Sequence, residues 1–267
     1  MRTSSWVGSV MVAAVAAPIA IAACSSSNNA SSSKIDAGAS NDASTPANDA
    51  AVDAGPPYLP AGYSLTPFLS ASSTTHTFTK ADQVLDPSKT YVVVLETTAG
   101  RIVWQLTPEH APIACNSFIF LTLNHYFDGI AFHRVIDAFV AQGGDPNTIS
   151  KGQNTWGTGG PGYAFDNEDT DAGLLADGGP DYSTIPNFDD NAGGLVAMAN
   201  TGQPNSNGSQ FFITFGAQSF LDGGYTIFGN VIEGMDVLPN IIRGEPKPAD
   251  QQSGYPTRIT EAHIGQK

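Results

Sequence analysis

Residues Phe132–Asp145 read FHRVIDAFVAQGGD, a run that places charged, aromatic and amide side chains close together. Arg134, a fixed cation, precedes the aromatic Phe139 by five residues and the amide Gln142 by eight. A second polar and aromatic run, MANTGQPNSNGSQFF, occupies residues 198–212. The two runs together predict one site, an apolar pocket edged by an arginine and by amides.

The rest of the chain has the pattern of a mainly-β protein. Hydrophobic residues make up 41% of its 267 residues and charged residues 13%, with 28 Gly and 18 Pro that favour turns. Segments rich in β-branched and aromatic residues predict short strands at 91–97, 101–106, 130–136, 195–199, 210–215, 225–232 and 259–264. Apolar residues at helical spacing predict helices over 112–124 and 235–242. Because the strands follow one another without a βαβ rhythm, we expect an antiparallel sheet closed on itself, which leaves no exposed edge.

The N-terminal part differs from this pattern. A positively charged start and the apolar run Val7–Ala23 predict a signal peptide over residues 1–23, since the run is short for a membrane span. Cys24 follows this run directly, which resembles a bacterial lipobox, so we expect an acylated Cys24. The protein would then be an exported, membrane-anchored lipoprotein of the bacterial cell envelope, on its periplasmic or cell-surface side. An ordinary secretory signal with an incidental cysteine is the alternative.

Residues 24–57 are rich in Ser, Ala and Asp and have too little apolar bulk to fold, so they predict a disordered tether. The folded part is expected over residues 89–265, preceded by an extension at 58–88 whose packing the pattern does not predict. An insertion-like loop at about 164–190 is rich in Gly and Asp. Its clustered acidic residues lack the spacing of an EF-hand, which leaves calcium binding as a minor alternative; they are Asp166, Glu168, Asp169 and Asp171. Cys115 has no motif around it and predicts a small buried hydrophobe rather than a catalytic thiol.

Composition and spacing exclude several functions. The net charge is −14 and no basic patch is present, so we expect no nucleic-acid partner. The five histidines match no metal-binding spacing, and no Gly-x-Ser-x-Gly nucleophile motif occurs. We therefore expect neither a metal nor a cofactor, and we expect a monomer. What remains is a non-covalent site made of Arg, Gln, Asn and Phe side chains.

Such a site suits a reaction that makes no bond, and isomerisation of proline peptide bonds is the obvious one. Rotation about the C–N bond has a barrier of about 18–20 kcal/mol because of its partial double-bond character, and X–Pro bonds have nearly balanced isomers. An apolar pocket can hold the proline ring while the acyl half rotates, and a donor can point at the imide nitrogen. That donor's bond strengthens only in the twisted state, which is differential binding of the transition state.

At these positions the chain resembles the cyclophilin-type peptidyl-prolyl isomerases. The resemblance covers roughly residues 89–265 and is carried by FHRVI at 132–136, Phe139, QGGD at 142–145, GTGGPGY at 157–163, MAN at 198–200, NGSQFFI at 207–213, LDG at 221–223 and Phe228-Gly229. It implies an eight-stranded antiparallel β-barrel capped by two α-helices, and peptidyl-prolyl cis-trans isomerase activity on proline-containing polypeptides. With the signal and the tether, the substrates would be exported proteins whose folding the enzyme assists.

By this resemblance Arg134 is the catalytic arginine. The implied substrate-binding residues are His133, Phe139, Val140, Gln142, Ala199, Asn200, Thr201, Gln210, Phe212, Phe220, Leu221 and Tyr225. The apolar ones would line the proline pocket, the glutamines would orient the substrate amide, and the backbone of 199–201 would bind the residues before the proline. His133 matches the pocket edge, although a lone histidine in a strand is more often structural. We assign Phe228 to the core.

Among the departures from the residues usual in the family, three concern implied substrate-binding positions. Phe220 stands where many eukaryotic members have Trp, which removes an indole N–H donor and predicts weak cyclosporin binding. Tyr225 stands where many have His, as in bacterial-looking members, and Val140 replaces a common Met. The altered rim leaves a second hypothesis open, a catalytically weak module that binds proline peptides or acts as a chaperone. A purely structural role as a tethered interaction domain is the third.

Overall fold

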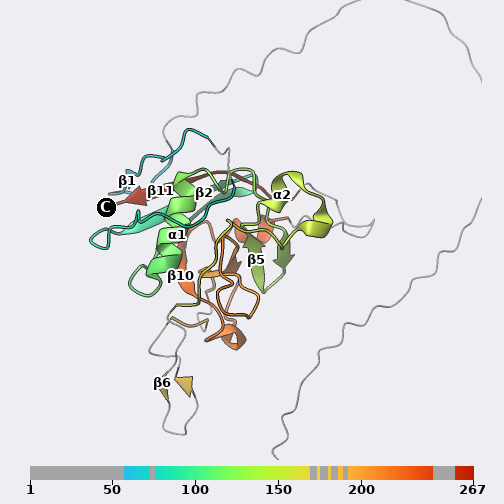
Figure 1. Ribbon diagram of the computed structural model, residues 1–267. Helices are drawn as coiled ribbons and strands as arrows, with labels where there is room; N and C mark the ends of the chain where they lie inside the picture. The colour runs from blue at the N-terminus through green and yellow to red at the C-terminus, as the bar shows by residue number, and fades with distance from the viewer. Residues whose placement is uncertain are drawn as a thin grey trace, which may run out of the picture. The chain divides into compact units, whose positions relative to one another are not determined.

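The computed structural model describes residues 57–72, 76–168, 173–174, 180–181, 186–188, 192–242 and 256–267 (Figure 1). Within these residues no helix is both long and apolar enough to cross a membrane. The predicted signal peptide, Cys24 and nearly all of the predicted tether lie outside the described residues, as do Asp169 and Asp171 of the acidic loop.

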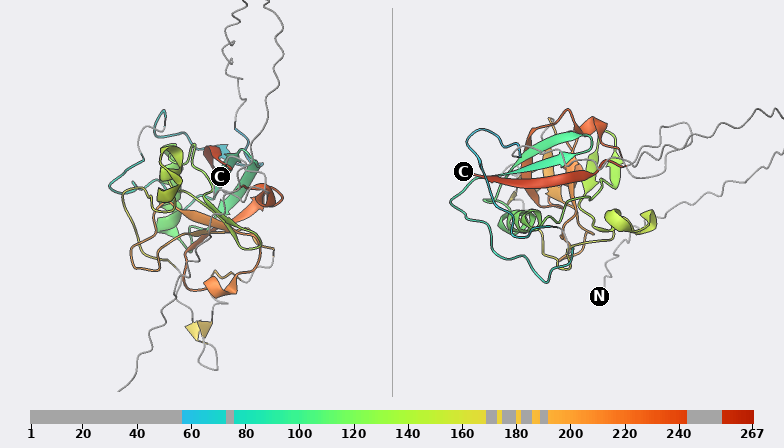
Figure 2. Two further views of the ribbon diagram at one scale, coloured as in Figure 1. Left: turned by 90° about the vertical axis from the view of Figure 1, so that its right-hand side faces the viewer. Right: turned by 90° about the horizontal axis from the view of Figure 1, so that it is seen from above.

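One antiparallel sheet organises the folded body (Figures 1 and 2). Its nine strands are, in the order of their pairing, β1 (Ser64–Leu65), β11 (Ile259–Gln266), β2 (Tyr91–Thr97), β3 (Gly100–Leu106), β10 (Ile227–Glu233), β8 (Leu195–Met198), β9 (Phe211–Thr214), β5 (Val140–Gly143) and β4 (Arg134–Ile136). A separate two-stranded sheet pairs β6 (Gly173–Leu174) with β7 (Pro180–Asp181). The mainly-β class predicted from the sequence pattern is confirmed.

The closed eight-stranded barrel that we expected is not confirmed. The sheet has nine strands and runs from β1 to β4, which are not paired with each other. The run 130–136, predicted as one strand, is a regular strand only in β4. Its first half instead meets the chain entering β11, through a bridge between Ala131 and Arg258 and a bond from Phe132 N–H to Thr257 O at 2.9 Å. A few bonds rather than a ladder therefore link these two parts of the chain.

Only the first of the two expected capping helices forms as predicted. α1 (Pro112–Leu123) begins with a proline, whose missing N–H needs no partner at a helix start. The helix predicted over 235–242 is wrong, because the chain forms only the 3-10 turn η4 (Leu238–Asn240) there. Pro239 explains the difference, since proline cannot donate to a helical ladder and disfavours the α conformation in the preceding residue. The other described helical pieces are α2 (Asn147–Ser150), η1 (Gln153–Thr155) and η3 (Ser219–Leu221).

Aromatic rings fill the core between α1 and the sheet. The Phe118 ring stacks on Phe127 with centroids 4.4 Å apart, and it meets Trp104 and Phe228 at 5.5 and 5.3 Å. Phe228 is fully buried, as predicted. Cys115 lies in the same core as the buried hydrophobe that we predicted, and desolvation raises the pKa of its thiol. A thiol kept protonated in this way is a poor nucleophile.

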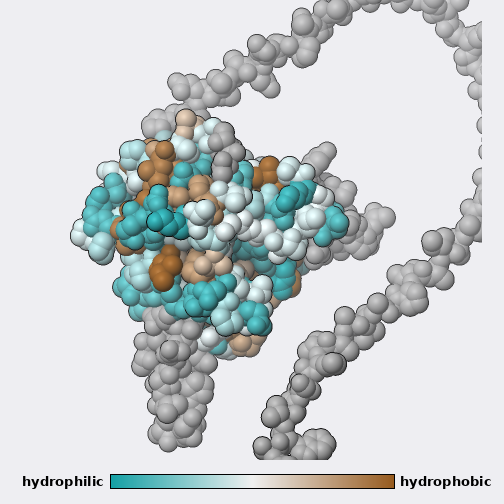
Figure 3. Space-filling view, viewed as in Figure 1, coloured by the Kyte–Doolittle hydropathy of each residue, from teal (hydrophilic) through white to brown (hydrophobic). Residues whose placement is uncertain are grey.

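The surface is polar by contrast. On the face shown in Figure 3, apolar residues lie in separate small areas among polar ones. Exposed apolar side chains scattered in this way are normal on protein surfaces. This face therefore gives no sign of an extended apolar binding area.

Residues 57–72 and 76–88, which we call the N-terminal strap, pack along the outside of the folded body (Figure 2). β1 adds to the edge of the sheet beside β11, and Leu59 and Tyr63 pack against valines of β2 and β3. Further along, the backbone N–H groups of Val84 and Leu85 donate to Asn116 Oδ1 in α1 at 2.9 and 3.0 Å. The strap is therefore bound to the folded unit by strand pairing, apolar packing and hydrogen bonds.

The start of α1 is capped from a distance by Glu168. Its two carboxylate oxygens accept bonds from the N–H groups of Ile113 and Ala114 at 2.8 and 2.7 Å. A helix start leaves such donors without an intrahelical partner, and a carboxylate also complements the helix dipole there. Asp166 is engaged as well, because its Oδ1 accepts from Asn205 N–H. Two of the four acidic side chains considered for calcium are thus already bonded to backbone.

We predict that Glu168→Ala lowers the free energy of unfolding by about 1–2 kcal/mol, because two helix-start N–H groups lose their acceptor. Glu109→Ala is the matched control, since Glu109 is exposed near the same helix start and should change stability by less than about 0.5 kcal/mol. Urea unfolding followed by circular dichroism measures both variants. Equal stability of Glu168→Ala and the parent protein would contradict the capping role.

Candidate functional site

A pocket of about 340 Å³, which we call the Arg134 pocket, opens beside the β4–β5 hairpin. It is lined by Arg134, Phe139, Val140, Gln142, Ala199, Asn200, Phe212, Phe220, Leu221 and Tyr225. All of these residues were predicted as site residues from the sequence. Strand pairing brings together those that lie on β4, β5 and β9, because β5 pairs with β4 on one side and with β9 on the other. The two sequence runs thus meet in one cavity.

Arg134 lies exposed at the edge of this pocket. Its guanidinium carbon is 5.6 Å from the centroid of the Phe139 ring, and its Nη1 donates to Gln142 Oε1 at 3.2 Å. Arg134 and Gln142 are direct partners in the β4–β5 ladder, so their side chains leave the same face of the hairpin. Among the described residues no carboxylate forms an ion pair with Arg134. The direction of its guanidinium group is therefore fixed by a neutral amide, that of Gln142.

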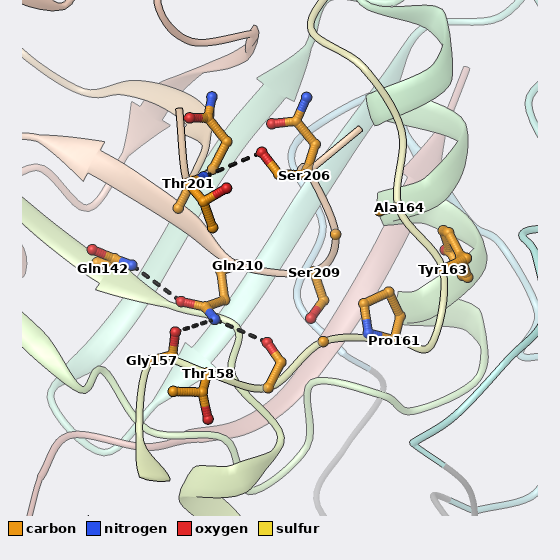
Figure 4. A pocket seen from close by; sticks show the side chains of 16 residues that line it. Gln142, Gly157, Thr158, Pro161, Tyr163, Ala164, Thr201, Ser206, Ser209 and Gln210 are labelled. Carbon is orange, nitrogen blue, oxygen red and sulfur yellow. Dashed lines mark hydrogen bonds between the residues drawn. The ribbon is translucent and has the colours of Figure 1, made fainter. Parts of the chain in front are cut away.

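Gln142 is itself held by a second amide. Its Nε2 donates to Gln210 Oε1 at 3.1 Å, and Gln210 Nε2 donates to the carbonyl oxygens of Gly157 and Gly159 at 3.1 and 2.9 Å (Figure 4). Backbone carbonyls can only accept, so each amide has a single compatible orientation. We call this series of bonds, from Arg134 to the two glycine carbonyls, the amide relay.

A second pocket of about 500 Å³, which we call the Gln210 pocket, lies next to the first. Figure 4 shows the residues that line this second pocket. The two pockets share Gln142, Ala199 and Asn200 as lining residues. Thr201 and Gln210, both predicted as site residues, line the second pocket. Most of its remaining wall consists of glycine and small polar residues from segments 157–164 and 206–209. Such a wall leaves the backbone accessible, which suits contacts to an extended peptide.

The floor of the Arg134 pocket is apolar. Phe212, Leu221 and Val140 are buried there in one cluster. At the rim, the Phe139 and Phe220 rings lie 5.5 Å apart, and Phe220 is 73% exposed. Such an apolar floor can hold an aliphatic ring of a ligand. The guanidinium group of Arg134 at the pocket edge can then donate to a polar atom of that ligand.

Two residues that support the site were not predicted, and both come from the insertion-like loop. The ring of Phe188 stacks beneath Phe212 with centroids 6.0 Å apart. Asn167 Oδ1 accepts from the side-chain amides of Asn200 and Asn207 at 3.2 and 2.9 Å, which ties the 200–209 loop in place. An aromatic residue isolated in a Gly- and Asp-rich stretch is a signal that could have indicated Phe188, whereas no signal in one sequence points to Asn167.

Among the predicted catalytic and substrate-binding residues, His133 is the one that lines neither pocket. It is buried, and its burial outweighs the opposing field of Asp145 and lowers the pKa of the imidazole. The ring is therefore neutral at neutral pH. This placement suits a structural histidine next to Arg134 rather than a group that touches a ligand.

Known proteins similar to this chain share one activity in their names. The sequence profile of the family described as "Cyclophilin type peptidyl-prolyl cis-trans isomerase/CLD" matches residues 92–264. The "Peptidyl-prolyl cis-trans isomerase-like 1" of Gibberella zeae is 36% identical over 173 residues, which are 63% of this chain and 94% of that protein. The "Peptidyl-prolyl cis-trans isomerase-like 3" of Homo sapiens is 36% identical over 173 residues, which are 64% of this chain and 91% of that protein. A crystal structure of a Cryptosporidium parvum cyclophilin type peptidyl-prolyl cis-trans isomerase matches with a TM-score of 0.50 at 29% identity, covering 66% of this chain and 97% of that chain.

We predict that Gln210→Ala lowers kcat/KM for an X–Pro peptide about 5- to 12-fold, because Gln142 loses its acceptor and Arg134 loses its fixed direction. Gln105→Ala, on an exposed position of β3, is the matched control and should stay within about twofold of the parent. A protease-coupled isomerisation assay measures both, and thermal unfolding verifies that both remain folded. Parent-level kcat/KM in folded Gln210→Ala would show that the relay does not position Arg134.

Proposed function

The chain belongs to the family of cyclophilin-type peptidyl-prolyl cis-trans isomerases, and we propose that it catalyses X–Pro isomerisation through Arg134. The observation that carries this proposal is the exposed guanidinium at the edge of an apolar pocket, oriented by the neutral amide of Gln142. A fixed cation beside an apolar ring site has the geometry that a twisted imide needs.

In the proposed mechanism the proline ring enters the Arg134 pocket and rests on Phe212 and Leu221. The acyl half of the bond then rotates, and loss of resonance localises the lone pair on the imide nitrogen. Arg134 donates a hydrogen bond to that nitrogen. The planar ground state offers no comparable lone pair, so the interaction lowers the barrier rather than only improving binding. No covalent bond forms or breaks, and no side chain has to change its protonation state.

The neighbouring groups fix the rest of the substrate in this proposal. Gln142 uses one N–H hydrogen for Gln210, and its second N–H hydrogen can donate to a substrate carbonyl. Asn200 and Thr201 border the Gln210 pocket, which continues from the Arg134 pocket. We assign this edge to the residues that precede the proline. The substrate is thus a proline-containing polypeptide bound in an extended conformation.

We further propose that this isomerase is exported, anchored by lipid and active on exported polypeptides, whose folding it assists. The apolar run Val7–Ala23, Cys24 directly after it, and the low-complexity stretch 24–57 support export and tethering. All of these residues lie outside the family match, which begins at residue 92, and all but Pro57 lie outside the described structure. The N-terminal sequence alone therefore supports this part of the proposal.

Arg134→Ala should lower kcat/KM for X–Pro peptides about 100- to 1000-fold, because the charge-assisted donor is lost. Stability should change little, since Arg134 is exposed. Arg134→Lys keeps the charge without the planar fork and should have intermediate activity. Isomerisation measured by NMR exchange spectroscopy tests both variants. Undiminished exchange in Arg134→Ala would overturn the mechanism, and a parent protein that binds proline peptides without accelerating exchange would instead be a peptide-binding module.

The anchor makes a separate prediction about the mature N-terminus. Mass spectrometry of the protein isolated from cell envelopes should show a polypeptide that begins at Cys24 and carries acyl groups. We expect more than one acyl group, because a single one gives only marginal attachment to a membrane. Cys24→Ser should move the protein out of the membrane fraction while its isomerase activity persists. An unmodified Cys24 in the mature protein would refute the lipid anchor.

A further inference from the structure

A third hollow adjoins the site on the side of the N-terminal strap. This strap pocket has a volume of about 510 Å³, and its walls include His76 and Thr77 from the strap and Ser150 and Lys151 from the end of α2. It shares residues 158–160 with the Gln210 pocket. The Gln210 pocket in turn shares Gln142, Ala199 and Asn200 with the Arg134 pocket. The three hollows therefore follow one another.

The segment that separates the Gln210 pocket from the strap pocket carries few side chains. It is made of Thr158, Gly159 and Gly160, so two of its three residues have no side chain. A Cβ built on Gly160 would meet no other atom within 4 Å, which means that the space above this residue is open. An extended peptide, which needs about 3.3 Å per residue, can pass over it from one pocket to the other.

The strap holds the far wall in place. Phe78 N–H donates to Pro161 O at 2.6 Å, directly beside the shared segment. The Phe78 ring packs on Phe120 and Tyr126, with centroids 5.1 and 6.4 Å apart. The strap lies before residue 92, where the family match begins. The residues of this wall that come from the strap thus lie outside the family match.

The chemistry of the strap pocket favours a negatively charged guest. Lys151 is exposed at its edge, and Thr77 and Ser150 place hydroxyl groups in the same lining. Among the described residues that line this pocket, none is Asp or Glu. The lining therefore includes one cation and no carboxylate, although the chain as a whole has a net charge of −14. The carboxylate of Asp145 lies behind the lining residues Gly159 and Asn147, where it is buried and accepts hydrogen bonds from the N–H groups of Asn147 and Gly157. A guest carboxylate would find an opposite charge and hydroxyl donors in the lining.

We propose that the strap pocket is a substrate subsite, which takes an acidic side chain located several residues before the isomerised proline. The direction follows from the assignment of the Gln210 pocket to the residues that precede the proline, because the strap pocket lies beyond it. This inference rests on the proposed function. It adds a preference for Asp or Glu at a remote position to an enzyme that otherwise reads the X–Pro bond and its nearest neighbours.

The experiment uses full-length protein and a series of peptides with one common Ala-Pro core. A single Asp is moved through positions three to seven before the proline, and each peptide has a partner with Asn at that position. The measured quantity is the ratio of kcat/KM for the Asp peptide to that for its Asn partner. We expect a ratio of about two to five at one or two adjacent positions and near one elsewhere, since exposed ion pairs are weak. The ratio should fall as salt is raised.

Two variants locate the effect. Lys151→Gln should bring the ratio to one at every position, and Ser150→Trp, which fills the pocket from an exposed position, should do the same. Lys80→Gln removes the same charge from an exposed strap residue that does not line the pocket, and it should leave the ratio unchanged. A ratio near one at all positions in the parent protein, or a preference that survives in Lys151→Gln, would overturn the proposal. Failure to isomerise even a short core peptide would contradict the proposed function instead, so the two outcomes remain distinct.

Discussion

The amide relay that holds Arg134 is the interaction on which the site depends. A cation that acts as we propose for Arg134 must be fixed in direction, yet a carboxylate partner would compensate its charge and occupy its donors. Gln142 avoids this conflict, because its amide oxygen accepts from Nη1 at 3.2 Å without carrying a charge. The relay ends on the carbonyls of Gly157 and Gly159, so no amide in it can turn over without losing a bond.

Two separate parts of the fold hold the ends of the relay. At one end, the register of β4 and β5 places Arg134 directly opposite Gln142. At the other end, the glycine segment is bonded to the buried Asp145, which accepts from Gly157 N–H. A Cβ on Gly159 would lie 2.1 Å from Asp145 Oδ1, so this close approach requires glycine. The glycines of the GTGG segment therefore do not make it flexible here. The absence of side chains lets the segment approach Asp145 closely, and this contact fixes the carbonyls of Gly157 and Gly159.

The N-terminal strap connects the site to a part of the chain that the family match does not include. It pairs with β11, packs on α1 and bonds to Pro161 within the same segment that ends the relay. Its residues also form one wall of the strap pocket. If the enzyme is tethered to a membrane as we propose, it would meet extended, incompletely folded polypeptides. A binding surface longer than the X–Pro bond would let it distinguish among them by sequence as well as by proline.

The sequence by itself determined the local features. β2, β3 and α1 lie where their patterns predicted them. The two sequence runs contain all the residues that line the Arg134 pocket except Phe220, Leu221 and Tyr225. These features depend on neighbouring residues, which is why side-chain spacing, β-branching and the residues that resemble a known family indicate them. Only the tertiary structure decided the number of strands, the irregular first half of the run 130–136, the packing of the strap, and the support from Phe188 and Asn167. It also showed that Pro239 limits the second helix to one 3-10 turn. Each of these except the last depends on contacts between segments distant in sequence, and such contacts leave no periodic pattern in a single chain.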